Sequence, residues 1–316
     1  MKYENLKPRP KEEPSNWGRL FLIIGICAVI LRLLIDSRFG HSSFLYLAIP
    51  FVIAVLLYFF TSAEEGQSTV ARYGSLFRNG TIVMLATSFI LFEGFICVLM
   101  FLPIYYISLF IGFAFSTALE RSRNKSKTPV HIIPVLVLMM SSEGMFLATT
   151  MPREGQVTYT QTVDASIAEL KQNMAEPIVF DQRRTWFLSI FPLPTEVKAA
   201  SLNVGDIHSL HFVYKRWFFT NIQEGDMQLL IADVGDDFVR TEIISNSTYL
   251  ASYMSIDGTE VHFTALDGNR TEVSITLFFE RKLDPAWYFG TLQRIAMRQS
   301  AAYLIDTVIQ RDYSDG

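Results

Sequence analysis

The sequence predicts two parts of different fold class, an N-terminal all-α transmembrane bundle and a C-terminal α+β domain. Apolar residues make up 50% of the chain, but they form long runs only before residue 150, after which alternation and turn residues take over. Up to Thr150 there are 13 Lys and Arg against 9 Asp and Glu, a net +4, and the remainder has 14 against 22, a net −8. We therefore expect a cytoplasmic tail over 1–19, a helical bundle over 20–149 and a separate domain over 153–316.

The bundle is expected to contain about five helices, because one membrane span needs roughly 20 mainly apolar residues. Three segments qualify directly, at about 20–35, 44–60 and 130–149. The run from Thr81 to Leu119 has 39 residues and would form a helix of about 58 Å, far more than one crossing needs. Pro103 removes a backbone donor within this run, so we expect a break there and two helices.

Basic residues predict how the bundle is oriented, because Lys and Arg beside short loops stay on the cytoplasmic side. With five crossings, three basic segments share that side: the N-terminal tail, the loop with Arg72 and Arg78, and the loop from Arg121 to Lys127. The C-terminal domain then lies outside the cytoplasm. A four-crossing alternative, with 81–119 as one tilted helix, would place this domain inside, and the sequence leaves the choice open.

Two acidic residues interrupt the apolar half, Glu93 and Glu143, and each is followed by a glycine. A carboxylate within a span is unfavourable unless it is neutralised or paired, so both are candidates for an intramembrane polar site. Such a site would serve protons, a lipid headgroup or a partner helix. In the simpler alternative, each glutamate is protonated or is bonded to Ser88, Ser141 or Ser142, and only fixes helix packing.

The C-terminal domain is predicted to contain a strand, one or two short helices, an antiparallel meander and a long helix. Val157–Val163 alternates as a strand does, Asp164 is a candidate N-cap for a helix from Ser166 to about Met174, and a second short helix is expected near 182–190. Turn residues, including Glu224-Gly225-Asp226 and Asp257-Gly258, separate six β-rich runs. These runs are 207–219, 227–234, 237–246, 249–256, 259–266 and 270–281.

The last helix is expected to open at Asp284-Pro285, with Asp284 as the N-cap, and to run to about Gln310. Gln293, Arg294 and Arg298 are expected to face away from its apolar stripe. Such a one-sided helix after a curved sheet should lie across the concave face of that sheet. The stripe has spacings of three and four residues and consists of Phe289, Leu292, Ala296, Ser300, Tyr303, Leu304, Thr307 and Val308.

The order of these elements resembles the START/polyketide cyclase-like (SRPBCC) superfamily with its helix-grip fold. More narrowly, the segment from Arg281 to Gly290, RKLDPAWYFG, looks like the pattern in membrane-anchored bacterial members. The resemblance covers 153–312 by element order and 206–305 more tightly, although Thr291 stands where such members usually have proline. It implies a multi-pass protein of the bacterial cytoplasmic (inner) membrane with a periplasmic domain, whose sheet and long helix enclose a hydrophobic cavity.

Strand alternation and the helix stripe identify the side chains that would line such a cavity. Arg184, Arg216, Arg240 and Glu242 are the polar groups that could converge at its mouth. The aromatic candidates for the lining are Trp186, Phe212, Tyr214, Tyr253, Phe289 and Tyr303.

No motif in the sequence predicts a metal site, a cofactor or a catalytic centre. His208 and His211 are three residues apart on one strand, so they point to opposite faces and cannot share an ion; with His262, they are expected at the surface. There is no GxSxG elbow and no Gly-rich phosphate loop, and both cysteines, Cys27 and Cys97, lie in the apolar half. The acidic domain argues against a nucleic-acid partner.

These observations lead to one main functional hypothesis and two alternatives. In the first, a membrane-tethered domain binds a hydrophobic small molecule or lipid without catalysis, with membrane lipids as partners. In the second, which the resemblance implies, the domain is a polyketide cyclase or dehydratase-like enzyme with an acid/base pair in the cavity. In the third, the domain is a structural or docking subunit that binds another membrane protein.

Overall fold

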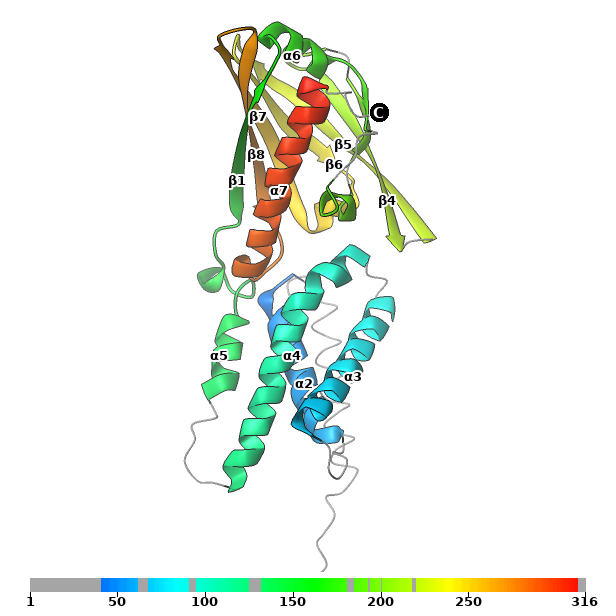
Figure 1. Ribbon diagram of the computed structural model, residues 1–316, viewed down its shortest axis with the longest axis vertical. Coiled ribbons are helices and arrows are strands. Elements are labelled where there is room, and N and C mark those ends of the chain that lie inside the picture. Colours follow the sequence, from blue (N-terminus) through cyan, green and yellow to red (C-terminus); the bar gives the residue numbers. More distant parts are fainter. Residues whose placement is uncertain are drawn as a thin grey trace, which may run out of the picture.

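The structure, a computed structural model, describes residues 41–61, 68–90, 95–124, 132–180, 185–192, 194–199, 201–217 and 220–311. Within these ranges, a helical half (41–149) and a sheet half (150–311) are stacked along the longest axis of the molecule (Figure 1). The first predicted span, 20–35, and Glu93 lie outside the described residues.

The helical half consists of helices that run along the long axis. A π-helical turn, η1 (Phe44–Ala48), continues into α2 (Ile49–Phe60), and α3 (Thr69–Ile90), α4 (Phe95–Asn124), α5 (Ile132–Met140) and the 3-10 turn η2 (Leu147–Thr149) follow. Helices α2 and α4 approach closely at Gly112, where an added Cβ would lie 2.5 Å from that of Ala54. A small residue at this crossing lets two apolar helices pack backbone to backbone.

The predicted break at Pro103 is wrong, because Pro103 lies inside α4. The described residues of this run nevertheless belong to two helices, α3 up to Ile90 and α4 from Phe95. A proline removes one hydrogen bond from a helix, and an apolar helix packed among others tolerates this loss.

The five-crossing bundle is also corrected, for the residues that the structure describes. One described helix, Val98–Ser122 within α4, is long and apolar enough to cross a membrane, and the apolar helix Phe44–Phe60 is shorter. The last predicted span, 130–149, contains a helix of nine residues, α5, which ends at Met140 and is followed by turns. The length of an apolar run therefore overstated the length of the helix formed.

The sheet half is built on one eight-stranded sheet in which every neighbouring pair is antiparallel. The strand order is β1-β8-β7-β6-β5-β4-β3-β2, and the sheet curls around the last helix (Figure 1). The strands are β1 (Glu154–Val163), β2 (Ile178–Val179), β3 (Pro194–Lys198), β4 (Ile207–Trp217), β5 (Thr220–Val234), β6 (Phe238–Asn246), β7 (Met254–Leu266) and β8 (Arg270–Arg281).

Two predicted turns are instead internal to strands. Asp257-Gly258 lies within β7 at a register shift against β8, and Glu224-Gly225-Asp226 lies within β5. At Gly258 an added Cβ would collide with the carbonyl oxygen of Thr241 on β6, so this glycine permits close approach of two strands at a bulge. Consequently the two runs predicted at 249–256 and 259–266 form a 3-10 turn, η4 (Tyr249–Ser252), and one long strand.

The first helix of the sheet half, α6 (Ile167–Ala175), matches its predicted position. Its N-cap is Ser166, whose side chain accepts a hydrogen bond from the Glu169 backbone N–H at 3.3 Å, rather than Asp164. Of the second predicted helix, near 182–190, the structure shows the 3-10 turn η3 (Leu188–Ile190).

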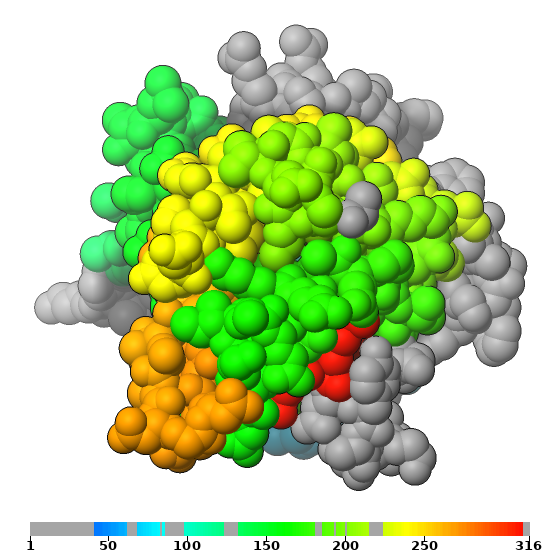
Figure 2. All heavy atoms as spheres, turned by 90° about the horizontal axis from the view of Figure 1, so that it is seen from above, coloured from blue at the N-terminus to red at the C-terminus, as the bar shows by residue number. Residues whose placement is uncertain are grey.

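The terminal helix lies on the concave face of the sheet, as predicted, and consists of η5 (Ala286–Gly290), α7 (Thr291–Leu304) and η6 (Ile305–Gln310). Its buried residues, including Met297, Ala301 and Ile305, join a core cluster with Val273 and Leu277 of β8. At its far end it packs against α6, where the Asn173 side chain donates a hydrogen bond to the Ile309 carbonyl at 2.9 Å. Figure 2 shows this end, with green atoms packed over the red end of the helix.

Candidate functional site

The main candidate site is a large apolar cavity of about 940 Å³ between the curled sheet and the terminal helix. It is not confined to the sheet half. Toward the helical half its lining continues over η1 and α2 and reaches α3 and α4, with Tyr46, Ile53, Leu56, Met84, Val98 and Tyr105. Toward the other end it reaches Met174 and Ile309. The two halves of the molecule therefore share one apolar interior.

The predicted helix stripe forms one wall of this cavity. Phe289, Leu292, Ala296, Ser300, Tyr303, Leu304 and Val308 all line it, whereas Thr307 is buried without lining it. The prediction that Gln293 faces away from the stripe is wrong. Its side chain is 7% exposed and lines the cavity. Since it follows Phe289 by four residues, it belongs to the same helix face.

The predicted aromatic candidates fall into three groups. Phe212, Tyr253, Phe289 and Tyr303 line the cavity. Tyr214 is buried but stacks on Tyr249, with ring centroids 4.8 Å apart, and does not line it. Trp186 is 78% exposed and lies at the surface, so alternation placed it on the wrong side.

Charged groups are scarce in the described cavity lining. Among the described lining residues, Glu176 is the only Asp, Glu, Lys or Arg, and its carboxylate pairs with Arg311 at 2.9 Å. His208, expected at the surface, is 7% exposed and lines the cavity, where its Nε2 lies 2.6 Å from the Ser201 carbonyl oxygen. An apolar wall with a few neutral polar groups suits an uncharged, mainly apolar guest.

The other polar residues selected from the sequence do not converge at the cavity. His211 pairs with Asp226, His262 pairs with Glu260, and Arg240 lies 3.5 Å from Glu242 on the exposed face of β6. Arg184 lies outside the described residues, as does the side chain of Arg216. Among the described residues there is no group of three His, Cys, Asp or Glu side chains that could hold a metal.

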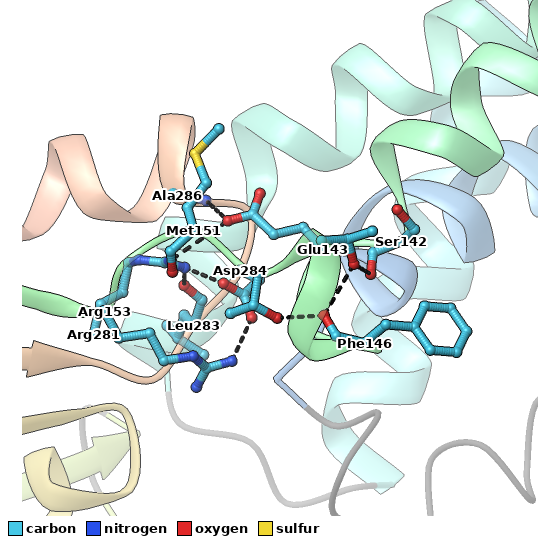
Figure 3. Close-up of polar contacts among 11 residues, drawn as sticks. Ser142, Glu143, Phe146, Met151, Arg153, Arg281, Leu283, Asp284 and Ala286 are labelled. Atoms are coloured by element: carbon cyan, nitrogen blue, oxygen red, sulfur yellow. Dashed lines mark hydrogen bonds and ion pairs between the residues drawn. The ribbon is translucent and has the colours of Figure 1, made fainter.

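A buried cluster of charges joins the two halves beside the cavity (Figure 3). Arg281, at the end of β8, pairs with both Asp284 and Glu143, the latter at 3.4 Å, and Arg153 pairs with Asp284 at 2.7 Å. Arg281 is 3% exposed and Asp284 is fully buried. We call these four residues the junction cluster.

The junction cluster explains two residues that the sequence assigned differently. Asp284 is not the helix N-cap, since that position is held by Pro285 and the Asp284 carboxylate faces the two arginines. Glu143 lies in the turn after α5, where its carboxylate also accepts a hydrogen bond from the Ala286 backbone N–H at 3.1 Å. The Glu143 carboxylate therefore bonds to Arg281 and Ala286 of the sheet half, rather than to Ser88, Ser141 or Ser142.

Aromatic side chains complete the junction. Tyr46 of η1 packs edge-on against Phe289, with ring centroids 4.8 Å apart. Tyr288 donates a hydrogen bond to the Met100 carbonyl of α4 at 2.6 Å, and burial raises the pKa of its hydroxyl to about 12. Tyr46 and Phe289 both line the cavity, so at this contact the lining passes from η1 to the terminal helix.

Comparison with known proteins finds similar solved structures. No family model and no curated protein matches the chain. Among solved structures, it is similar to a START superfamily protein from Mycobacterium smegmatis, with 15% identity, 49% of this chain and 97% of that chain covered, and a TM-score of 0.34. It is also similar to the Zhui aromatase/cyclase from Streptomyces sp. R1128, with 17% identity, 49% and 92% covered, and a TM-score of 0.32.

A third similar structure is truncated norcoclaurine synthase from Thalictrum flavum, with 10% identity, 53% of this chain and 98% of that chain covered, and a TM-score of 0.35. Each of these three similarities covers about half of this chain.

Proposed function

We propose that this protein binds a hydrophobic small molecule or lipid in the shared cavity, and that the helical half anchors the cavity at a membrane. The observation that carries the proposal is the cavity itself, about 940 Å³ of apolar interior bounded by both halves. This volume is at the upper end of the range of roughly 300 to 1,000 Å³ that is common for ligand pockets.

The wall of the cavity favours an apolar ligand over a polar one. Leu277, Ala296 and Met297 are examples of apolar side chains that the fold buries and that line the cavity. An apolar ligand would remove this wall and its own surface from water, at about 25 cal/mol per Å² of apolar area. A strongly polar ligand would lose its hydration there without gaining enough partners.

The surface of the helical half supports anchoring at a membrane. Helix α5 has the sequence IIPVLVLMM, and none of its nine residues is buried. A soluble protein rarely exposes a contiguous apolar surface of this kind, whereas a helix in contact with lipid tails does. The residues of α5 that are at least half exposed are Ile132, Val135, Leu136, Leu138, Met139 and Met140.

The distribution of basic residues supports the orientation. The start of α3 and the end of α4 lie toward the end of the helical half that is farthest from the sheet (Figure 1), and these two helix ends carry Arg72 and Arg121 in the sequence. Since Lys and Arg favour the cytoplasmic side, this arrangement would place the sheet half outside the cytoplasm of a bacterial cell.

A cavity-filling substitution tests the proposal. Ala296 lines the cavity and is 7% exposed, whereas its neighbour Ile295 points outward and is 44% exposed. Ala296→Trp should fill the space and prevent binding, and Ile295→Trp adds the same side chain outside the cavity and should not. The measurement is the amount of small molecule or lipid that solvent extracts from full-length protein purified in mild detergent, per mole of protein.

We expect the wild-type protein and Ile295→Trp to retain the same compound, and Ala296→Trp to retain at most a tenth of it. Circular dichroism checks that both variants are folded. Equal retention by all three proteins, or no retained compound in the wild type, would contradict the proposal.

A further inference from the structure

One polar side chain in the cavity has an unusual environment. Gln293, on α7, is 7% exposed and lines the cavity, and its amide Nε2 donates a hydrogen bond to the Tyr253 carbonyl at 3.4 Å. Because a backbone carbonyl can only accept, this contact fixes which end of the amide is the nitrogen. The other end, Oε1, is buried and has no hydrogen-bond partner among the described residues.

A buried amide oxygen without a donor is unfavourable, and native structures rarely leave one unexplained. Gln293 lies in a wall that is otherwise mostly apolar, between Phe289 and Met297. A leucine at this position would fit the apolar stripe without leaving an unpaired acceptor. The glutamine therefore indicates that something inside the cavity supplies the donor.

The charges of the lining residues restrict the class of ligand that can carry this donor. Glu176 is the one charged side chain among the described lining residues, and Arg311 already neutralises it. A phosphate or carboxylate headgroup drawn into the cavity would be buried without a cation, which is strongly unfavourable. A hydroxyl group or an uncharged amide N–H meets Gln293 without this penalty.

We infer that the ligand is an uncharged amphiphile whose hydroxyl or amide N–H donates a hydrogen bond to Gln293 Oε1, with a long apolar part extending along the cavity. The inference rests on the proposed function and narrows its ligand class. From Gln293 to Ile309 the terminal helix follows the cavity for about 24 Å, at 1.5 Å per residue. That length accommodates an extended alkyl chain, so the polar group sits near the junction and the chain lies under the sheet.

Three compounds that differ only at the polar end test the inference: hexadecan-1-ol, its methyl ether 1-methoxyhexadecane, and hexadecyl phosphate. The alcohol has a donor, the ether has none, and the phosphate is charged. Each is added at the same mole fraction to full-length protein in mild detergent. The apparent dissociation constant comes from the rise in the midpoint of thermal unfolding with ligand concentration.

We expect the alcohol to bind about 5-fold more tightly than the ether, as one net hydrogen bond would give, and the phosphate to bind most weakly. In Gln293→Leu the difference between alcohol and ether should disappear while both still bind. Gln299→Leu, the same change on the same helix but outside the cavity lining, should keep the difference.

Each other outcome is decisive. Equal binding of alcohol and ether by the wild type, or a preference that persists in Gln293→Leu, overturns the role of Gln293. Tightest binding of the phosphate overturns the assignment of an uncharged ligand. If none of the three compounds shifts the midpoint, the proposed function fails, and with it the inference.

Discussion

The two halves of this protein differ in what they expose, although both bury an apolar core. In the sheet half, apolar side chains such as Val239, Val273 and Ile305 are fully buried, and hydroxyl pairs such as Thr158 with Thr276 lie on the exposed face. In the helical half, α5 exposes an entirely apolar surface, and buried hydroxyl groups such as that of Tyr105 bond inside.

Under the proposed function, this difference means that one chain is built for two environments. Polar links inside the helical half include the Tyr105 hydroxyl donating to the Gly80 carbonyl at 2.7 Å and Tyr58 donating to Glu120 at 2.5 Å. In water such hydrogen bonds contribute little stability beyond that from the burial of apolar surface. Among apolar helices in lipid they are a main source of specific packing. The junction cluster joins the two halves, so we expect substitutions there to have the largest effect on stability.

The largest effect is expected from Arg281→Met. This change removes the arginine that contacts both Glu143 and Asp284, and leaves a fully buried carboxylate with one of its two cations. Breaking a buried ion pair by removing one partner costs about 3 to 5 kcal/mol. We expect a loss of this size in the free energy of unfolding, measured by denaturant titration of full-length protein in mild detergent.

Arg240→Met is the matched control within the sheet half. Its partner Glu242 lies 3.5 Å away and both side chains are about half exposed, so the loss should be below about 1 kcal/mol. Similar losses for the two variants would mean that the junction cluster does not hold the halves together.

A smaller effect is expected from Tyr288→Phe, which removes the hydrogen bond to Met100 across the junction. Near pH 8 the variant should be less stable by about 1 kcal/mol. Burial raises the pKa of Tyr288 to about 12 in the folded protein, above its unfolded value of about 10. The stabilisation it provides is therefore complete below pH 10 and is lost as the pH rises through 12.

The wild type should consequently lose more stability than Tyr288→Phe between pH 10 and pH 12, and the difference between them should close and then change sign. The check is the midpoint of thermal unfolding of both proteins at half-unit steps from pH 8 to pH 12. A gap that stays constant over this range would show that the buried hydroxyl does not contribute in the way described.

Local pattern predicted most of the sheet half correctly, and the reasons for its errors are physical. Alternation and turn residues located the strands of the meander, and the spacing from Phe289 to Val308 identified the wall of the cavity. Asp257-Gly258 misled, because a glycine that permits a bulge in one strand has the same local signature as one that closes a hairpin. Gln293 was missed because a polar residue on an apolar face looks like a boundary of the stripe.

Contacts between distant residues could not be predicted from one sequence. Glu143 and Arg281 are 138 residues apart, and nothing local to either indicates the other. The same holds for Tyr46 and Phe289, whose contact joins η1 to the terminal helix. The continuation of the cavity into the helical half depends on such contacts, so it emerged only from the structure.

The most direct test of the two-environment account measures whether lipid or water surrounds a nitroxide spin label. The label is placed at Val135, on α5, or at Ile244, on β6, in full-length protein reconstituted in lipid vesicles. Both positions are about half exposed, and Cys27 and Cys97 would be replaced by serine. The account predicts that the label at 135 collides mainly with lipid-soluble oxygen and the label at 244 mainly with a water-soluble nickel complex. Equal access of the nickel complex to both labels would contradict it.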